Sequence, residues 1–207
     1  MKRILMLLAN GVEPLEIAAF TDVFGWADLV GETPFTLVHA GLRSEIQTTF
    51  GLHLRISNRL EDLNLDEYDA LALPGGSEPA GFYEEALSGP YLAAIQHFAG
   101  AGKPIASVCV SSIALGTAGV LEGRNATVYH QIGGKRMKQL VDTGAHFLDR
   151  PVVEDGQFIT SSGPGTASEV AFLLLERLSS ADNSLTVRKR MRFDSPSQHW
   201  FETPQVM

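Results

Sequence analysis

The feature that most constrains the fold is the alternation of apolar runs of strand length with segments of helix length. The strand-length runs are RILMLLA, FTLVHAG, YDALALPGG, KPIASVCV and FITSS. Helix-length segments lie between them, such as EPLEIAAFTDVFGWADLV, which has Pro14 in its first turn. Strands that are apolar on both faces are typical of a parallel sheet that is covered on both sides. We therefore predict an α/β fold in which helices pack on both faces of a parallel sheet.

The length and composition suit one domain. The chain has 207 residues, of which 44% are hydrophobic and 19% are charged, so it can bury a substantial core. We assign residues 1–195 to a single domain. Residues 196–207 lack periodicity, and we expect them to form a C-terminal arm or tail.

Charge and hydropathy argue against several classes of partner. A net charge of -8 argues against a protein that binds the phosphate backbone of nucleic acid. The basic run from Arg188 to Arg192 is expected to be the solvated face of a terminal helix. The first apolar run is only about six residues long and lacks a cleavage site, and no run approaches the roughly 20 residues of a membrane span. With a single cysteine and hence no internal disulfide, we expect a cytoplasmic protein without nucleic-acid or membrane partners.

The single cysteine, Cys109, lies where an apolar run becomes a stretch of small residues. It closes the run PIASV and opens the segment SSIALGTAG, with Ser107 and Ser111 two positions away on either side. An isolated cysteine is most often an inert, buried small hydrophobe. A sharp strand-to-helix turn, however, needs small neighbours and exposes its side chain to the free amides of the helix start, which favour the thiolate. The position therefore favours a nucleophile with a lowered pKa.

Two other strand ends supply partners for this cysteine, because the carboxyl ends of parallel strands meet at one edge of a sheet. Gly75 and Gly76 indicate a turn with positive φ, and the Gly76 and Val110 amides are candidates for an oxyanion hole. Glu16, in the first turn of its helix, either stabilises the helix dipole or lies beside Cys109 with a raised pKa. Glu13 is a competing carboxylate that we expect to be more exposed.

Five motifs together resemble the ThiJ/PfpI superfamily over residues 1 to about 180: NGVEPLE, LALPGG, IASVCVSS, GVLEGRNATVY and VEDGQFITSSGPGTASEVAFLLLE. The last of them is most similar to the branch that contains the Parkinsonism-associated deglycase. The resemblance implies a flavodoxin-like sandwich, a homodimer and a reactive cysteine at the elbow. It also places the partner glutamate at Glu16 and the oxyanion amides at Gly76 and Val110. No cofactor is expected, and the histidines show no metal-ligand spacing.

The chain departs from the family pattern at two positions. The slot that holds an assisting histidine in many relatives contains Tyr129, and His130 follows it. Neighbours on a strand point to opposite faces, so His130 can reach the cysteine only if the segment is irregular. Both residues remain candidates for binding substrate. Val110 directly after the cysteine matches neither the protease-like nor the isonitrile-hydrating relatives, although GVLEGRNAT resembles the latter branch.

These observations favour a cysteine-dependent enzyme of the glyoxalase or deglycase type that acts on small reactive carbonyls. Cys109 would add to an aldehyde, the Gly76 and Val110 amides would hold the oxygen, and Glu16 would move protons. One alternative is a redox-sensing or chaperone-like stress protein that uses a Cys109 sulfinic acid. Another is a small-substrate amidase or hydratase. Each hypothesis expects a Cys109 pKa well below about 8.5.

Overall fold

The computed structural model describes residues 1–131 and 133–193, so the arm predicted at residues 196–207 lies outside the described residues. Its main sheet is parallel except at one edge, where β10 runs antiparallel to β11. In spatial order the strands are β10 (Val152–Asp155), β11 (Phe158–Ser161), β7 (Ile105–Val108), β6 (Ala70–Leu73), β1 (Lys2–Leu8), β2 (Phe35–Gly41) and β5 (Asn58–Arg59).

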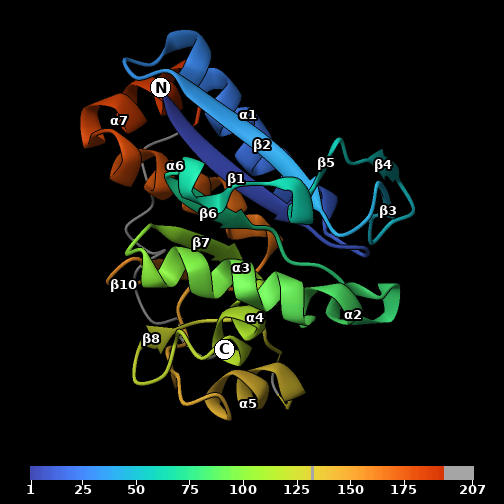
Figure 1. The fold of residues 1–207 in the computed structure, drawn as a ribbon. Coiled ribbons are helices and arrows are strands. Elements are labelled where there is room, and N and C mark those ends of the chain that lie inside the picture. Colours follow the sequence, from blue (N-terminus) through green and yellow to red (C-terminus); the bar gives the residue numbers. More distant parts are fainter. Residues whose placement is uncertain (132, 194–207) are drawn as a thin grey trace.

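Helices cover both faces of this sheet (Figure 1). On one face α1 (Pro14–Val30), α6 (Ala167–Leu178) and α7 (Ala181–Arg190) pack against one another, and α3 (Gly89–Gly100) and α4 (Ser111–Thr117) cover the other. The smaller elements are β3 (Glu45–Gln47), β4 (His53–Arg55), α2 (Phe82–Ala86), β8 (Asn125–Ala126), α5 (Lys135–Val141), β9 (His146–Phe147) and short 3-10 turns at Leu60–Asp62, Leu65–Glu67, Glu78–Ala80 and Pro164–Thr166. The predicted α/β sandwich is confirmed.

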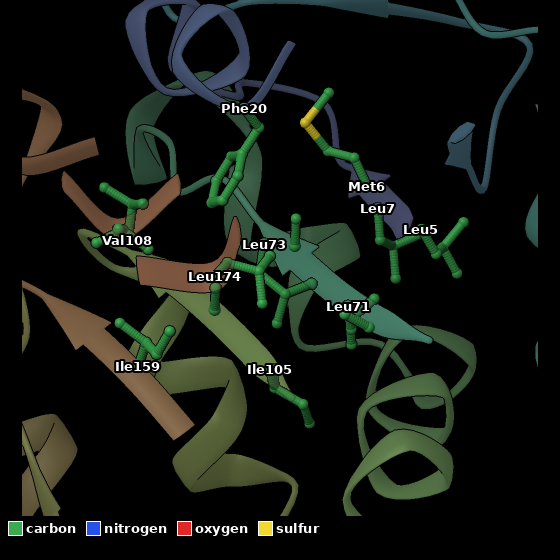
Figure 2. Packing of buried hydrophobic residues seen from close by; sticks show 14 of the residues in the cluster. Leu5, Met6, Leu7, Phe20, Leu71, Leu73, Ile105, Val108, Ile159 and Leu174 are labelled. Atoms are coloured by element: carbon green, nitrogen blue, oxygen red, sulfur yellow. The ribbon is translucent and has the colours of Figure 1, made fainter. Parts of the chain in front are cut away.

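The central strands are buried because helices cover both of their faces. Every residue of β6 and β7 is buried, which explains why these strands are continuous apolar runs and not alternating patterns. Figure 2 shows Leu71 and Leu73 of β6 beside Ile105 of β7, with Phe20 of α1 and Leu174 of α6 close by. The rigid core beneath the strand ends holds the loops that follow them.

The basic run at the end of the chain is only partly exposed. Lys189 and Arg190 face solvent, but Arg188 is buried and donates to a Glu169 carboxylate oxygen at 2.5 Å. Its guanidinium also lies 4.1 Å from the centre of the Phe172 ring. The expectation of a fully solvated face was therefore wrong at Arg188, because the helical turn points this residue toward α6 together with Val187.

The strand order creates a crevice at the carboxyl edge of the sheet. The chain leaves β1 for β2 on one side and later enters β6 on the other, so the connections after β1 and β6 diverge. The loop after β1 leads to Glu16, β6 is followed by Gly75 and Gly76, and the neighbouring β7 is followed by Cys109. Within the described part of the chain, no helix is long and apolar enough to cross a membrane.

Candidate active site

Cys109 occupies a strained turn between β7 and α4. Its φ is 60°, in the left-handed region that non-glycine residues seldom adopt. The surroundings hold this conformation: the Cys109 amide donates to the Ser161 carbonyl at 2.9 Å, and its carbonyl accepts the Tyr129 amide at 3.3 Å. Ser111 is fully buried and donates its hydroxyl to the Pro74 carbonyl at 2.7 Å, tying the helix start to the end of β6. The cysteine is therefore at the predicted strand-to-helix elbow.

Glu16 lies beside the sulfur and is completely buried. One carboxylate oxygen, Oε2, accepts the Gly75 amide, and the carboxyl group lies close enough to the Cys109 side chain to influence its protonation. The other oxygen, Oε1, is buried without a hydrogen-bond partner among the described residues. Burial raises the pKa of Glu16 to about 8, with a smaller contribution from the Glu13 charge, whereas the Gly75 hydrogen bond and the nearby Cys109 side chain oppose the rise. Glu13 is more exposed than Glu16, as expected from the sequence, although burial raises its pKa too.

The expected low pKa of Cys109 was wrong. Burial raises the pKa of its thiol, and the Glu16 carboxylate raises it further by electrostatic repulsion. The Val110 amide lowers the pKa by donating to the sulfur, and the Arg136 charge lowers it less, but neither outweighs burial. Only 6% of Cys109 is exposed, so few water molecules can solvate an ionised sulfur.

Glu16 and Cys109 therefore titrate as a pair that shares protons. Both groups are neutral below about pH 8, and the pair loses its first proton near that pH. The resulting single charge resides mainly on the carboxylate, which can accept the thiol proton as the sulfur attacks. The arrangement suits a nucleophile that is deprotonated during the reaction and not before it.

Gly75 and Gly76 are required for close packing, and neither has the positive φ expected from the sequence. A Cβ atom at Gly75 would lie 2.7 Å from the Val108 carbonyl oxygen and 2.9 Å from the Cys109 Cβ. A Cβ atom at Gly76 would overlap the Phe82 ring. The positive φ belongs instead to the cysteine itself, because the sharp turn is made one strand further along the sheet.

The amides proposed for an oxyanion hole both border the cavity. Gly76 pairs with Val12 in an isolated antiparallel bridge, whose hydrogen bonds are Glu13 N–H to the Gly75 carbonyl at 2.8 Å and Ser77 N–H to the Gly11 carbonyl at 2.9 Å. The Gly76 amide takes part in neither of these bonds. Gly76 and Val110 line the same cavity as the cysteine, and their role as an oxyanion hole remains a prediction.

A cavity of about 340 Å³ opens above the cysteine. Six of the residues singled out from the sequence line it, namely Glu13, Glu16, Gly76, Cys109, Val110 and Tyr129. The other lining residues are Ser77, Gln131, Arg136 and Pro164. Gly75 is not among these lining residues, but its amide donates to the Glu16 carboxyl group that lines the cavity.

The structure separates Tyr129 from His130. Tyr129 lines the cavity, and its hydroxyl accepts a hydrogen bond from the Gln131 side chain at 2.9 Å. His130 points elsewhere: its Nδ1 lies 2.8 Å from the Val128 carbonyl and its Nε2 lies 3.0 Å from an Asp149 carboxylate oxygen. The expectation that His130 helps to bind substrate was therefore wrong, because both ring nitrogens are occupied outside the cavity.

Sequence reasoning missed Arg136, the one arginine that lines the cavity among residues 1–131 and 133–193. It lies in the first turn of α5, with its guanidinium carbon 5.5 Å from the centre of the Tyr129 ring. Its sequence context, GGKRMK, gives no signal for this role, because the position of α5 relative to the cavity depends on tertiary packing and not on a local motif. Among residues 1–131 and 133–193, no three His, Cys, Asp or Glu side chains are arranged to hold a metal ion.

An α/β sheet whose strand-to-helix elbow presents a cysteine to a buried glutamate defines a recognisable class of protein. The sequence profile of the DJ-1/PfpI family matches residues 2–177. The chain therefore belongs to the DJ-1/PfpI family, which confirms the resemblance seen in the motifs.

Individual relatives agree with this assignment. A protein named as a deglycase in Pyrococcus abyssi is 31% identical over 163 residues, which cover 79% of this chain and 91% of the relative. The dj-1beta protein of Drosophila melanogaster is 30% identical over 193 residues, covering 91% of this chain and 95% of that protein. The crystal structure of Drosophila melanogaster DJ-1beta superposes with a TM-score of 0.80 at 26% identity, covering 94% of this chain and 99% of that one.

Proposed function

We propose that the protein is a cysteine-dependent enzyme that converts small α-oxoaldehydes to 2-hydroxy acids, a glyoxalase-type reaction. The observation that carries this proposal is that Cys109 and the buried carboxyl group of Glu16 line the same small cavity. The family includes relatives that are named deglycases, whose name also implies chemistry on reactive carbonyls.

The first step is addition of the sulfur to the aldehyde carbon. A carbon–sulfur bond forms as the carbonyl π bond breaks, and the thiol proton passes to the ionised Glu16 carboxylate, which becomes abundant near pH 8. The Gly76 and Val110 amides stabilise the developing alkoxide, which then takes the proton from Glu16 and becomes a hemithioacetal hydroxyl.

The second step moves a proton within the bound intermediate. Glu16 removes the proton from the former aldehyde carbon and returns it to the neighbouring carbonyl carbon, while the hemithioacetal hydroxyl proton moves to the oxygen of that neighbouring carbon. The hemithioacetal thereby becomes a thioester with a hydroxyl group on the adjacent carbon. Water then cleaves the carbon–sulfur bond, releasing the 2-hydroxy acid and restoring the thiol. The overall reaction adds one water molecule and needs no external oxidant or reductant.

The redox-sensing alternative is less favoured. Peroxide oxidises thiolates, and burial keeps the Cys109 thiol protonated at neutral pH. We therefore expect slow oxidation of Cys109 by peroxide near pH 7.

The proposal is tested by measuring lactate formed from methylglyoxal. The wild type should produce lactate, Cys109→Ala should produce none, and Glu16→Gln should lose at least about a hundredfold in rate, as is typical when a general acid–base group is removed. No lactate from the wild type, or equal rates in the wild type and Cys109→Ala, would refute the proposal.

A further inference from the structure

The cavity above Cys109 contains a cation that no neighbouring acid neutralises. Arg136 forms no ion pair with any residue in the part of the chain that the structure describes. Its Nε is buried and has no hydrogen-bond partner among those residues. A buried, unpaired N–H donor on a charged group is costly, so such a group is expected where a ligand completes its hydrogen bonds.

The neighbouring cations of α5 differ from Arg136. Lys135 pairs with Glu78, and Lys138 pairs with Asp142 within the helix. Both lysines are exposed and neither lines the cavity. Arg136 is thus the cation on this helix whose charge remains available to a molecule in the cavity.

The aromatic ring beneath Arg136 holds it in place. The guanidinium lies over Tyr129, a contact that favours arginine, and Gln131 fixes the Tyr129 hydroxyl. Arg136 and Cys109 line the same cavity of about 340 Å³, so one small molecule can contact both. A guanidinium recognises carboxylates through paired N–H donors, which gives direction as well as affinity.

We infer that Arg136 is a specificity-determining residue that binds the carboxylate of a small carbonyl compound while the carbonyl carbon faces the Cys109 sulfur. This inference rests on the proposed function, since it names the class of substrate that the same site would take: short aldehydes that also bear a carboxylate. Below about pH 8 the Glu16 carboxyl group is largely protonated, so it repels a bound carboxylate little.

The test uses two thiol reagents of similar size, iodoacetate and iodoacetamide, which differ by one negative charge. Each alkylates the thiol by forming a carbon–sulfur bond and releasing iodide, while the thiol proton goes to Glu16 or to solvent. Cys109 is the only cysteine in the chain, so the gain in mass reports on this site alone. The ratio of the two rates cancels any change in thiol pKa, because both reagents need the same ionised sulfur.

Arg136→Gln should lower the iodoacetate-to-iodoacetamide rate ratio about tenfold, as expected for the loss of a hydrogen-bonded charge. The ratio for Arg136→Lys should lie between those of the wild type and Arg136→Gln. The control Lys138→Gln removes a cation of the same helix that lies outside the cavity, and it should leave the ratio unchanged. An equal ratio in the wild type and Arg136→Gln would overturn the inference, as would an equal fall in Lys138→Gln.

A second measurement needs no variant. Glyoxylate and glyoxal are two-carbon aldehydes that differ by a carboxylate, and glyoxylate should protect the wild type from iodoacetamide at lower concentration than glyoxal does. Stronger protection by glyoxal would contradict the inference even if the variants fail to fold. Neither measurement depends on turnover. A protein that prefers the anionic reagents but forms no lactate would therefore refute the proposed reaction and still support carboxylate binding by Arg136.

Discussion

Replacing Glu16 with Gln should change how the stability of the protein depends on pH. The pKa of Glu16 is raised from 4.5 to about 8 in the folded protein, because the carboxyl group is buried. Between these values the unfolded chain has lost the proton and the folded chain still holds it. Folding stability must therefore fall as pH rises, by about 1.4 kcal/mol per pH unit.

Summed over this range, Glu16 lowers the free energy of unfolding by about 5 kcal/mol between pH 4.5 and pH 8. Gln has nearly the same shape, can still accept the Gly75 amide, and does not titrate. The stability advantage of Glu16→Gln over the wild type should thus grow with pH across this window and stop growing above about pH 8.

The assay is urea unfolding of both proteins at several pH values from 4.5 to 9, with the difference in free energy plotted against pH. Glu84→Gln is the matched control, because it removes an exposed carboxylate from α2, and its curve should run parallel to that of the wild type. A Glu16→Gln curve that also runs parallel to the wild type would refute the reasoning, since it would mean that Glu16 is ionised in the folded protein.

Three further substitutions test other parts of the structure. Glu169→Gln should destabilise the protein by about 3–5 kcal/mol in thermal or urea unfolding, because Arg188 would remain buried without a negatively charged partner. The double variant Glu169→Gln with Arg188→Met should recover part of this loss, and no recovery would contradict the account. Gly75→Ala should lower the free energy of unfolding by about 1–3 kcal/mol and slow alkylation of Cys109, because the new Cβ would lie 2.7 Å from the Val108 carbonyl oxygen. A variant as stable and as reactive as the wild type would show that the packing is looser than described. His130→Ala should leave the rate of lactate formation within about twofold of the wild type, because its ring bonds outside the cavity, and a loss of a hundredfold or more, typical of a general acid–base group, would show that this histidine takes part.

Much of the fold could be predicted because burial leaves a direct signal in the sequence. β6 and β7 are buried on both faces, so their apolar runs predict a parallel sheet without any knowledge of its neighbours. The sequence did not reveal the short elements β3, β4 and α5. Strands of three residues and a helix of seven are too short to show a clear hydrophobic periodicity.

The candidate site was predictable to the extent that it follows strand ends. Cys109 directly follows β7, Gly76 lies in the loop after β6, and Glu16 lies in the first turn of the helix that follows β1. Parallel strands bring the segments after their carboxyl ends to one edge of the sheet. The pKa of Cys109 was not predictable in this way. It depends on how few water molecules reach the sulfur and on the distance to Glu16, and these quantities arise from packing between elements far apart in the chain.

Arg136 and Arg188 illustrate the same limit for charged residues. Sequence reasoning treats a basic run as a solvated surface, which is right for most of its members. Whether one arginine enters a cavity or pairs inside the core is decided by the face that its helix turns toward the rest of the protein.

The central claim is that Cys109 and Glu16 share a proton and act as one unit. The most direct test is the rate of Cys109 alkylation by iodoacetamide as a function of pH in the wild type and in Glu16→Gln. The account predicts that the wild-type rate rises with an apparent pKa of about 8, as the Glu16 carboxylate forms and can accept the thiol proton. In Glu16→Gln this rise near pH 8 should be absent, because no group of the pair titrates there and burial still raises the pKa of the thiol. Identical profiles in the two proteins, or a wild-type rate that is already constant between pH 6 and pH 9, would contradict it.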